Sequence, residues 1–421
     1  MFFLRAGGVG DRMDIGIVCQ NASTGGWRYA VTLATALARL SDRPRVTLWS
    51  HVERLPPGAA DRLRGADVRL ADLPGRLPRT LRQSRRRRLT GWRRFDEALV
   101  AMWQRSKLRR RERYGRRLAR VLAGHDVVHF AWPYDLDPPP VAVPMSFIPH
   151  DFIYAHEFGV TTYDHVAWTT TRASHRRWLD RAAPVVSSDF VAAELRAVFP
   201  DHRSVVDVIP LSSLLPASVV ATPPAALAAR WGLPADYVLC PNNLMPHKNL
   251  GALVSALWHL RRAGTPLKLV VCGPDTAGVR AVVRSPLYAD RVDAPGEWDV
   301  LGLGMVGDDD LAGLLAGALV VVNPSLCEAG SGSALDAWSC GSAVALADIP
   351  AFRDQVRALG TRAEWFDPRD PRDIARMITG AAEERDRLAA DGAASRAALA
   401  RYGWDEVARR YMAVFTRLVA A

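Results

Sequence analysis

The chain has 421 residues, of which 49% are hydrophobic, so it can form two or three globular domains with large cores. Its formal net charge is +11, but residues 76–120 alone hold 18 Lys and Arg against three acids, and the rest of the chain carries 37 basic against 41 acidic residues. A chain that is nearly neutral outside one segment lacks the pattern of a protein that is basic throughout, so we expect no nucleic-acid partner.

The five cysteines and the first residues indicate the compartment. No two cysteines form a CxxC pair, and each lies in or beside an apolar run, which favours buried free thiols in a reducing environment. We see no clustered ligands for a metal. Residues 1–12 lack the apolar core of a signal peptide, and no stretch approaches ~18 uninterrupted apolar residues. We therefore expect a cytoplasmic protein without a transmembrane helix.

The first half of the chain alternates predicted strands and helices. Residues 14–20 predict a buried strand and residues 27–40 a helix, and between them Gly25 and Gly26 form a turn that would let a ligand approach a helix N-terminus. Further strands are predicted at 44–49, 67–70, 127–130, 144–149 and 185–188. This order of elements is typical of a doubly wound α/β domain.

Two polar features stand near the ends of these strands. His150 directly follows the strand at 144–149, at the carboxyl end where α/β domains bind ligands, although a histidine in this position is more often structural. Asp135 and Asp137 form a DxD pair, which could hold a metal and a diphosphate. Because three prolines follow it instead of a strand end, a polar loop explains it better.

The basic segment 76–120 has apolar residues at roughly helical spacing among its arginines, including Trp92, Leu99 and Trp103. One interpretation is a surface helix that contacts anionic lipid or a polyanionic acceptor. The other is an amphipathic helix packed on the domain with a solvated arginine face, which is the more usual case.

The second half repeats the α/β pattern after a stretch rich in Pro and Ser at 211–226. Its strands are predicted at 237–240, 267–272, 300–305, 318–322 and 343–347. Lys248 ends a polar loop just before the helix 250–263, where a cation suits a phosphate group. The three acids at 308–310 are explained by the dipole of the helix that follows them.

The segment between the strands at 318–322 and 343–347 combines Glu328, a loop of Gly and Ser, and a helix at 334–339 that contains Asp336. Such a unit places backbone N–H groups and a helix N-terminus at an anionic ligand. By itself it could also be a buried βαβ unit with an exposed Glu. Two α/β halves form a cleft, however, and the convergence there of Lys248, Glu328 and His150 argues for a nucleotide-sugar site.

Several motifs of the sequence resemble those of a known enzyme family. Residues 320–350 resemble the glutamate–seven residues–glutamate motif of the retaining glycosyltransferases of family 4, which have the GT-B architecture. PNNLMPHKNL resembles the donor-phosphate loop of that family, and STGGWRYA and PHDF resemble its glycine loop and His-Asp motif. The resemblance implies an α/β fold of two Rossmann-like domains facing a cleft. Its parts would be an acceptor domain at 13–212, a linker at 213–230, a nucleotide-sugar domain at 231–402, and a helix at 403–421 that crosses back to the first domain.

The resemblance also implies roles for individual residues. Lys248 would neutralise the leaving diphosphate, Glu328 would bind the donor hexose, and His150 would lie near the reacting bond; these three form the expected catalytic set. The expected donor-binding residues are Gly25, Gly26, Asn243, His247, Lys248, Glu328, Gly330, Ser331, Gly332, Ser333 and Asp336, with no metal ligand among them.

Two positions depart from the family pattern. Asp336 stands where the family usually has a Glu that binds the ribose hydroxyls, and its side chain is one methylene shorter. Asn243 stands five residues before the Lys, where the family often has an Arg. His247 could supply a second positive charge, but only when it is protonated.

The implied activity is a retaining, metal-independent hexosyltransferase without a cofactor. Its donor would be a nucleotide diphosphate sugar, of UDP or GDP type, and its acceptor a hydroxyl on a cell-envelope polysaccharide or glycolipid precursor or on a secondary metabolite. Segment 76–120 would be the contact if the protein associates with an anionic membrane. The alternatives are a GT-B epimerase, a sugar-phosphate synthase, and a catalytically silent GT-B partner protein.

Overall fold

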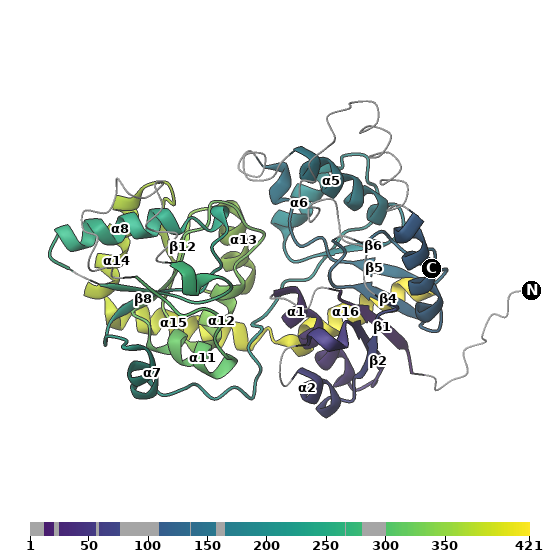
Figure 1. The fold of residues 1–421 in the computed structure, drawn as a ribbon, viewed down its shortest axis with the longest axis horizontal. Coiled ribbons are helices and arrows are strands. Elements are labelled where there is room, and N and C mark those ends of the chain that lie inside the picture. Colours follow the sequence, from purple (N-terminus) through teal and green to yellow (C-terminus); the bar gives the residue numbers. More distant parts are fainter. Residues whose placement is uncertain are drawn as a thin grey trace, which may run out of the picture.

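The computed structural model describes residues 12–20, 25–55, 59–75, 109–134, 136–156, 165–265, 267–279 and 300–421. These residues form two α/β domains that lie side by side (Figure 1). Most of the basic segment 76–120 and Asp135 of the DxD pair lie outside the described residues. In the described part of the chain, no helix is long and apolar enough to cross a membrane.

The N-terminal domain is built on a parallel sheet in the order β3-β2-β1-β4-β5-β6-β7. Its strands are β1 Asp14–Val18, β2 Arg45–Ser50, β3 Arg69–Asp72, β4 Val127–Phe130, β5 Met145–Phe147, β6 Ala183–Val186 and β7 Asp207–Val208. Its helices include α1 Gly25–Ala38, α2 Ala59–Gly65, α5 His165–Leu179 and α6 Asp189–Val198. Apolar clusters on both faces of the sheet form the core of this domain.

The C-terminal domain repeats the architecture with the order β10-β9-β8-β11-β12-β13, again parallel. Its strands are β8 Tyr237–Cys240, β9 Lys268–Val271, β10 Val300–Gly302, β11 Val320–Asn323, β12 Val344–Ala347 and β13 Glu364–Phe366. Its helices include α7 Pro224–Trp231, α8 Leu250–Arg262, α11 Asp308–Gly317, α12 Gly332–Cys340, α13 Pro350–Leu359, α14 Pro371–Glu383 and α15 Arg385–Ala400.

Both sheets reverse their strand order in the middle, between β1 and β4 and between β8 and β11. Loops that leave neighbouring strands at such a point run in opposite directions and open a crevice at the carboxyl ends of the strands. The glycine turn follows β1, the Lys248 loop follows β8, and the Glu328 loop follows β11. This topology brings together loops that are about 300 residues apart in the sequence.

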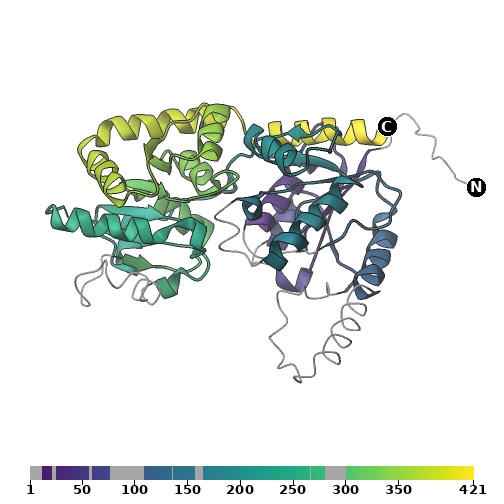
Figure 2. The same ribbon diagram turned by 90° about the horizontal axis from the view of Figure 1, so that it is seen from above.

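Helix α16, Trp404–Ala420, leaves the C-terminal domain and packs on the N-terminal domain (Figure 2). Its buried face joins the core around α1, where the Tyr29 hydroxyl donates a 2.6 Å hydrogen bond to the Tyr411 hydroxyl and lies 2.9 Å from Nε2 of His129. Burial lowers the pKa of His129 to about 3, so this histidine is neutral. The C-terminal helix is therefore an integral part of the N-terminal domain.

The interval predicted as a linker, 213–230, is only partly extended, because its second half forms α7. Pro224 occupies the first turn of this helix, where its missing N–H costs nothing, and Gly232 ends it in the left-handed conformation at φ 63°. Leu227 is buried in the core of the C-terminal domain. The prediction did not recognise that the Ala-rich run after Pro224 favours a helix.

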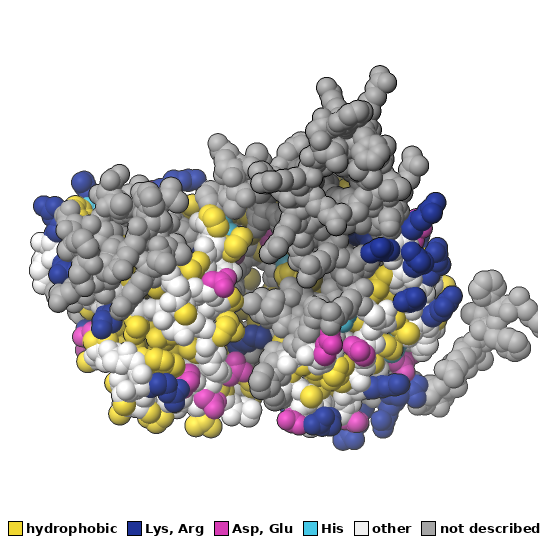
Figure 3. All heavy atoms as spheres, in the orientation of Figure 1, with side chains coloured by type: hydrophobic (Ala, Val, Ile, Leu, Met, Phe, Trp, Pro, Cys, Tyr) yellow, Lys and Arg dark blue, Asp and Glu magenta, His cyan; other side chains and the backbone are white. Residues whose placement is uncertain are grey.

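The described end of the basic segment is an amphipathic helix. Residues 109–122 are helical, with Tyr114, Leu118 and Leu122 buried in the core of the N-terminal domain. Its arginines at 109, 110, 113, 116, 117 and 120 are exposed. Figure 3 shows Lys and Arg gathered at the edge of the N-terminal domain where this helix lies. For these residues the structure agrees with the interpretation of a packed helix with a solvated arginine face.

Two adjacent glycines at the start of α1 have different surroundings. A Cβ atom on Gly26 would lie 2.4 Å from the Trp132 ring, whereas a Cβ atom on Gly25 would have no atom within 4 Å. The close approach of α1 to Trp132 therefore depends on a glycine at position 26. At position 25 the helix start faces open space.

We predict that Gly26→Ala lowers the free energy of unfolding by roughly 1–3 kcal/mol, because Trp132 must move out of a packed position. Gly25→Ala serves as the matched control and should change stability by less than about 1 kcal/mol. Urea unfolding followed by tryptophan fluorescence measures both. Equal midpoints for the two variants would contradict the packing role assigned to Gly26.

Candidate functional site

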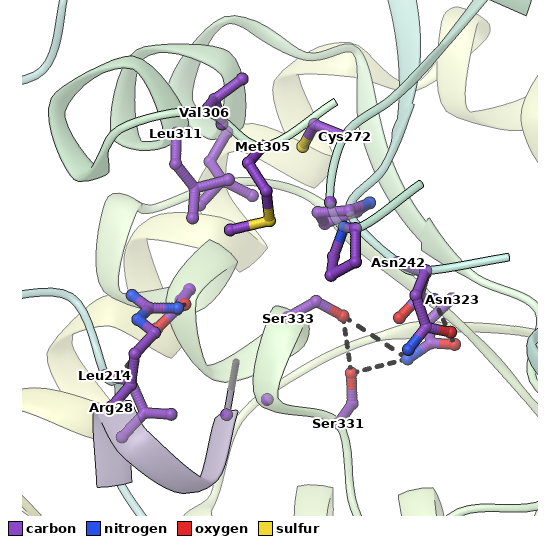
Figure 4. A pocket seen from close by; sticks show the side chains of 18 of the residues that line it. Arg28, Leu214, Asn242, Cys272, Met305, Val306, Leu311, Asn323, Ser331 and Ser333 are labelled. Atoms are coloured by element: carbon purple, nitrogen blue, oxygen red, sulfur yellow. Dashed lines mark hydrogen bonds and ion pairs between the residues drawn. The ribbon is translucent and has the colours of Figure 1, made fainter. Parts of the chain in front are cut away.

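A cavity of about 330 Å³ lies between the two domains at the carboxyl ends of their strands. Two helix N-termini open onto it, at Gly25 of α1 and at Gly332 of α12. Figure 4 shows Arg28 and Leu214 on one side of this cavity and Asn242 and Asn323 on the other, with Ser331 and Ser333 between them. Described residues that line it include Gly25, Arg28, Leu214, Asn242, Asn243, Lys248, Met305, Asp308, Asn323, Gly330, Ser331, Gly332, Ser333 and Asp336. Partial positive charge at two helix ends makes the cavity suited to an anion.

Lys248, which lines this cavity, forms an ion pair with Glu328, which is not among the described lining residues. Lys248 Nζ donates to Oε1 of Glu328 at 2.5 Å, and the two side chains are only 17% and 10% exposed. The Ser325 hydroxyl oxygen lies 2.8 Å from the same carboxylate oxygen. The Glu328 side chain is therefore partly buried and held in one position, and it is not an exposed surface residue of the loop.

The loop that carries Lys248 is held against the Glu328 loop by Asn249. This residue adopts the left-handed conformation at φ 55°, and its side-chain amide donates to the carbonyls of Pro324 and Pro368 at 3.0 and 2.7 Å. Asn tolerates this conformation better than most residues. The loop PNNLMPHKN therefore supplies both the cation and the residue that fixes its position.

Asn323, at the end of β11, is a site residue that the sequence analysis did not identify. Its side chain is buried, its amide donates to the Ser331 hydroxyl at 2.9 Å, and its carbonyl oxygen accepts from the Ser325 hydroxyl at 2.6 Å. A polar residue that directly ends a run of three valines, just before a proline, was the available signal. Asn323 links the Glu328 loop to the start of α12.

The Gly-Ser loop at 330–333 lines the cavity, but not all of its N–H groups are free. Ser331 caps α12, because its hydroxyl accepts from the Ala334 N–H at 3.1 Å. The Ser331 N–H itself donates to Oε1 of Gln355 on α13 at 2.7 Å. The prediction of this loop as a donor-binding element stays untested, and its available N–H donors come from the neighbours of Ser331.

Asp336 faces the cavity from α12, and its carboxylate is 95% buried and engaged in several contacts. One oxygen accepts from the Ser213 hydroxyl at 2.8 Å and from the backbone N–H groups of Leu214 and Leu215 at 2.8 and 3.2 Å. The other accepts from Arg28 at 3.0 Å. The residue expected to bind ribose therefore also holds the interdomain linker and α1.

Asn243 and His247 do not provide a second cation. Asn243 lines the cavity, and its side-chain oxygen accepts from the Met245 N–H at 3.1 Å. His247 is buried, which lowers the pKa of its imidazole below the ordinary value and keeps the ring neutral at pH 7. The possibility that a protonated His247 replaces the family's arginine is thus disfavoured by its burial.

His150 belongs to the N-terminal side of the cleft. Its Nε2–H donates to the carbonyl of Ala131 at 2.7 Å, and its ring packs against Trp132 and Tyr134 with centroids 5.0 and 6.1 Å away. Burial lowers the pKa of His150 to about 4, so the ring is neutral. It can contact a ligand as a neutral hydrogen-bonding or packing group, and its role near a reacting bond stays a prediction.

Asp151 is a second carboxyl at the cleft that the sequence analysis did not single out. Its carboxylate accepts from the Ile153 N–H at 3.2 Å. Burial raises the pKa of Asp151 to about 6, and the charge of Glu328 in the other domain adds to the rise. The two carboxyl groups therefore interact across the cleft.

A second polar contact crosses the cleft beside Glu328, from His156 to the Cys327 thiol. His156 forms an ion pair with Glu194 of α6. Hydrogen bonds to the Cys327 thiol and to Glu194 raise the pKa of His156 to about 10, so the imidazole is protonated.

Among the described residues, no group of three or more His, Cys, Asp or Glu is placed to hold a metal ion.

Parts of the chain are similar in sequence to known glycosyltransferases. Residues 230–398 match the family model of the group 1 glycosyl transferases. The D-inositol 3-phosphate glycosyltransferase of Thermobispora bispora is 31% identical over 199 residues. That match covers 46% of this chain and 46% of the relative, so it spans about half of each protein.

Solved structures resemble the whole chain. HepE of Anabaena, solved with UDP and glucose, has a TM-score of 0.65 at 15% identity and is matched over 96% of this chain and 100% of its own. The sucrose-phosphate synthase of Thermosynechococcus elongatus has a TM-score of 0.65 at 17% identity, over 97% and 100% of the two chains. WaaG, a glycosyltransferase of lipopolysaccharide biosynthesis, has a TM-score of 0.60 at 13% identity, over 96% and 99%.

The matches to solved structures establish the fold of the chain. Two parallel-sheet α/β domains with these neighbours make a GT-B, Rossmann-like fold, as the sequence predicted. The match to the family model of the group 1 glycosyl transferases lies within the C-terminal domain, over residues 230–398.

Proposed function

We propose that the protein is a retaining glycosyltransferase, which moves a hexose-type sugar from a nucleotide diphosphate sugar to an acceptor hydroxyl. The observation that carries this proposal is the Lys248–Glu328 ion pair at a cavity onto which two helix N-termini open. A cation with helix N-termini suits the diphosphate, and a fixed carboxylate suits the hydroxyls of a sugar. The match of residues 230–398 to the group 1 glycosyl transferases supports the same function.

In this proposal the three predicted catalytic residues and two of the predicted donor-binding residues have defined tasks. Lys248 has three N–H donors, so it can keep its contact with Glu328 and donate to a phosphate oxygen as well. Glu328 accepts hydrogen bonds from the donor sugar, and Asp336 contributes to the ribose side of the site. Neutral His150 contacts the sugar or acceptor near the reacting bond. Gly25 leaves room for the donor at the start of α1.

The proposed reaction needs no covalent intermediate. The bond between the anomeric carbon and the leaving phosphate oxygen breaks, the acceptor oxygen bonds to that carbon on the same face, and the acceptor proton passes to the leaving phosphate. Double displacement would require a free carboxylate nucleophile with a partner about 5 Å away. Glu328 is instead paired with Lys248 at 2.5 Å, so positioning and electrostatic stabilisation are the better source of catalysis.

The donor and acceptor classes remain part of the proposal. Neighbouring structures hold UDP, UDP-glucose and UDP-2-fluoro glucose, which favours a UDP-type donor over a GDP-type donor. A sugar-phosphate synthase is the second candidate, because sucrose-phosphate synthase and trehalose-6-phosphate synthase are among the structural neighbours. The exposed arginines at 109–120 would be the contact if the acceptor lies in an anionic membrane.

The function is tested first by a panel of UDP, GDP, ADP and dTDP sugars. We expect one donor class to raise the melting temperature, because a ligand that binds the native state stabilises it. With that donor and candidate hydroxyl or sugar-phosphate acceptors, NMR of the product should show the anomeric configuration of the donor. A product of inverted configuration would refute the retaining mechanism, and the lack of both binding and turnover would refute the enzyme.

We predict that Glu328→Gln lowers the turnover number on the order of 100-fold, because the amide keeps the shape of the side chain but loses its charge. Melting temperature is measured beside turnover, because Lys248 loses its charged partner in this variant and the fold is expected to be less stable. Glu384→Gln, on an exposed carboxylate between α14 and α15, is the matched control and should keep full activity. Wild-type turnover in Glu328→Gln would exclude Glu328 from the proposed catalytic set.

The raised pKa of Asp151 predicts that the free energy of unfolding depends on pH. Since the folded protein raises the pKa of this carboxyl from 3.8 to about 6, its proton stabilises the fold below about pH 4, and this contribution is lost as the pH rises through 6. Asp151→Asn is neutral at every pH. Its free energy of unfolding relative to wild type should therefore rise on the order of 2 kcal/mol between pH 4 and pH 8. Urea titrations at both pH values, with exposed Asp42→Asn as control, measure this, and a constant difference would contradict it.

A further inference from the structure

We infer that Arg28, in the first turn of α1, is a donor-binding residue that supplies the second cationic contact to the diphosphate. This inference rests on the proposed function, and it adds a cationic side chain of the N-terminal domain to a phosphate site whose other cation, Lys248, belongs to the C-terminal domain. Sequence analysis did not identify Arg28, because an arginine in an amphipathic helix has no distinguishing pattern.

The position of Arg28 connects it to the phosphate site. Arg28 and Gly25 line the same cavity as Lys248 and the first residues of α12. In Figure 4 the guanidinium of Arg28 rises from the start of α1 beside Leu214, across the cavity from Asn242. An anion between the two helix N-termini would therefore meet Lys248 on the C-terminal side and Arg28 on the N-terminal side.

Arg28 is held in place and still has an unused donor. Its Nη1 donates to Asp336 at 3.0 Å, which fixes the plane of the guanidinium. Its Nη2 lies 3.6 Å from Asp308 Oδ1, too far for a hydrogen bond, and this atom is buried without an acceptor. A buried N–H without an acceptor costs free energy, which a phosphate oxygen would recover. Guanidinium groups bind phosphate oxygens with two parallel hydrogen bonds.

The charged side chains that line the cavity also indicate Arg28 as the second cation. The charged side chains among its described lining residues are Arg28, Lys248, Asp308 and Asp336. Lys248 is paired with Glu328, so without Arg28 two carboxylates would face the ligand with little compensation. Like charges at this range would repel a diphosphate. Asn243 is neutral, and burial lowers the pKa of His247 and keeps it neutral, so neither residue supplies the missing charge.

A purely structural role for Arg28 makes different predictions. The Arg28–Asp336 contact joins α1 to α12, so Arg28 could serve only to hold the two domains together. Loss of such a contact would weaken the binding of every ligand in the cavity, with or without phosphate. Loss of a phosphate contact would weaken a nucleoside diphosphate and leave the nucleoside nearly unchanged. The ratio of the two affinities separates these roles.

The test uses the full chain and calorimetric titration with whichever of UDP, GDP, ADP and dTDP the wild type binds, and with the matching nucleoside. We expect Arg28→Ala to weaken the diphosphate about 10- to 100-fold and the nucleoside by less than about threefold. Arg28→Lys, which keeps the charge and loses the planar fork, should fall between. Arg62→Ala is the matched control, because Arg62 pairs with the same Asp308 at 3.3 Å but is not among the described lining residues. It should leave both affinities unchanged.

A second substitution tests whether a cation at another lining position can replace Arg28. Asn243 lines the cavity from the C-terminal domain, so Asn243→Arg in the Arg28→Ala background should restore part of the diphosphate affinity. Circular dichroism and melting temperature identify variants that fail to fold, and Arg28→Gln, which can still donate to Asp336, replaces Arg28→Ala in that case.

The outcomes distinguish the two proposals. Equal losses for nucleoside and diphosphate in Arg28→Ala, or no loss for either, would overturn the inference on Arg28. If Lys248→Ala weakens the diphosphate while Arg28→Ala does not, the proposed function stands and Arg28 alone is excluded. If the wild type binds none of the four diphosphates, the proposed function itself fails, and the inference on Arg28 fails with it.

Discussion

The carboxylate of Asp336 is the contact on which the arrangement of the two domains depends. It accepts hydrogen bonds from the linker at Ser213, Leu214 and Leu215 and from Arg28 of the first domain. A buried carboxylate with this many donors is held in one position, and the groups that donate to it are held with it. The linker, the start of α1 and the start of α12 therefore share one anchor. That anchor lies in the wall of the cavity, so the shape of the site and the relation of the domains are set together.

The chemistry of the site follows from where parallel strands end. In both sheets the strand order reverses at the centre, and the loops with Gly25, Lys248 and Glu328 leave from that point. Helices α1 and α12 begin there, so two helix N-termini face one space. Two ion pairs lie at this space: Lys248 with Glu328 within the C-terminal domain, and Arg28 with Asp336 between the two domains. Such a site can hold an anion and hydroxyl groups in adjacent positions.

Buried polar groups explain which predictions held and which could not be made. The fold, the alternation of strands and helices, and the Gly-Ser loop were predictable, because apolar periodicity and glycine turns are local properties of the chain. The neutrality of His247 and the engagement of Ser331 were not, because each depends on what packs around the residue. The second half of the predicted linker became α7 through a Pro start and an Ala-rich run, a local signal that was missed.

The sequence by itself determined the two-domain α/β architecture, the order of the loops, and the presence of a Lys and a Glu at loop positions suited to a sugar donor. These follow from strand and helix periods, which depend on neighbouring residues alone. Only the tertiary structure decided that Lys248 and Glu328, 80 positions apart, form an ion pair, and that Asp336 faces the linker as well as the cavity. It alone placed Arg28, 308 positions from Asp336, in the same cavity. Long-range contacts set the charge and hydrogen bonding of each group, and no local pattern encodes them.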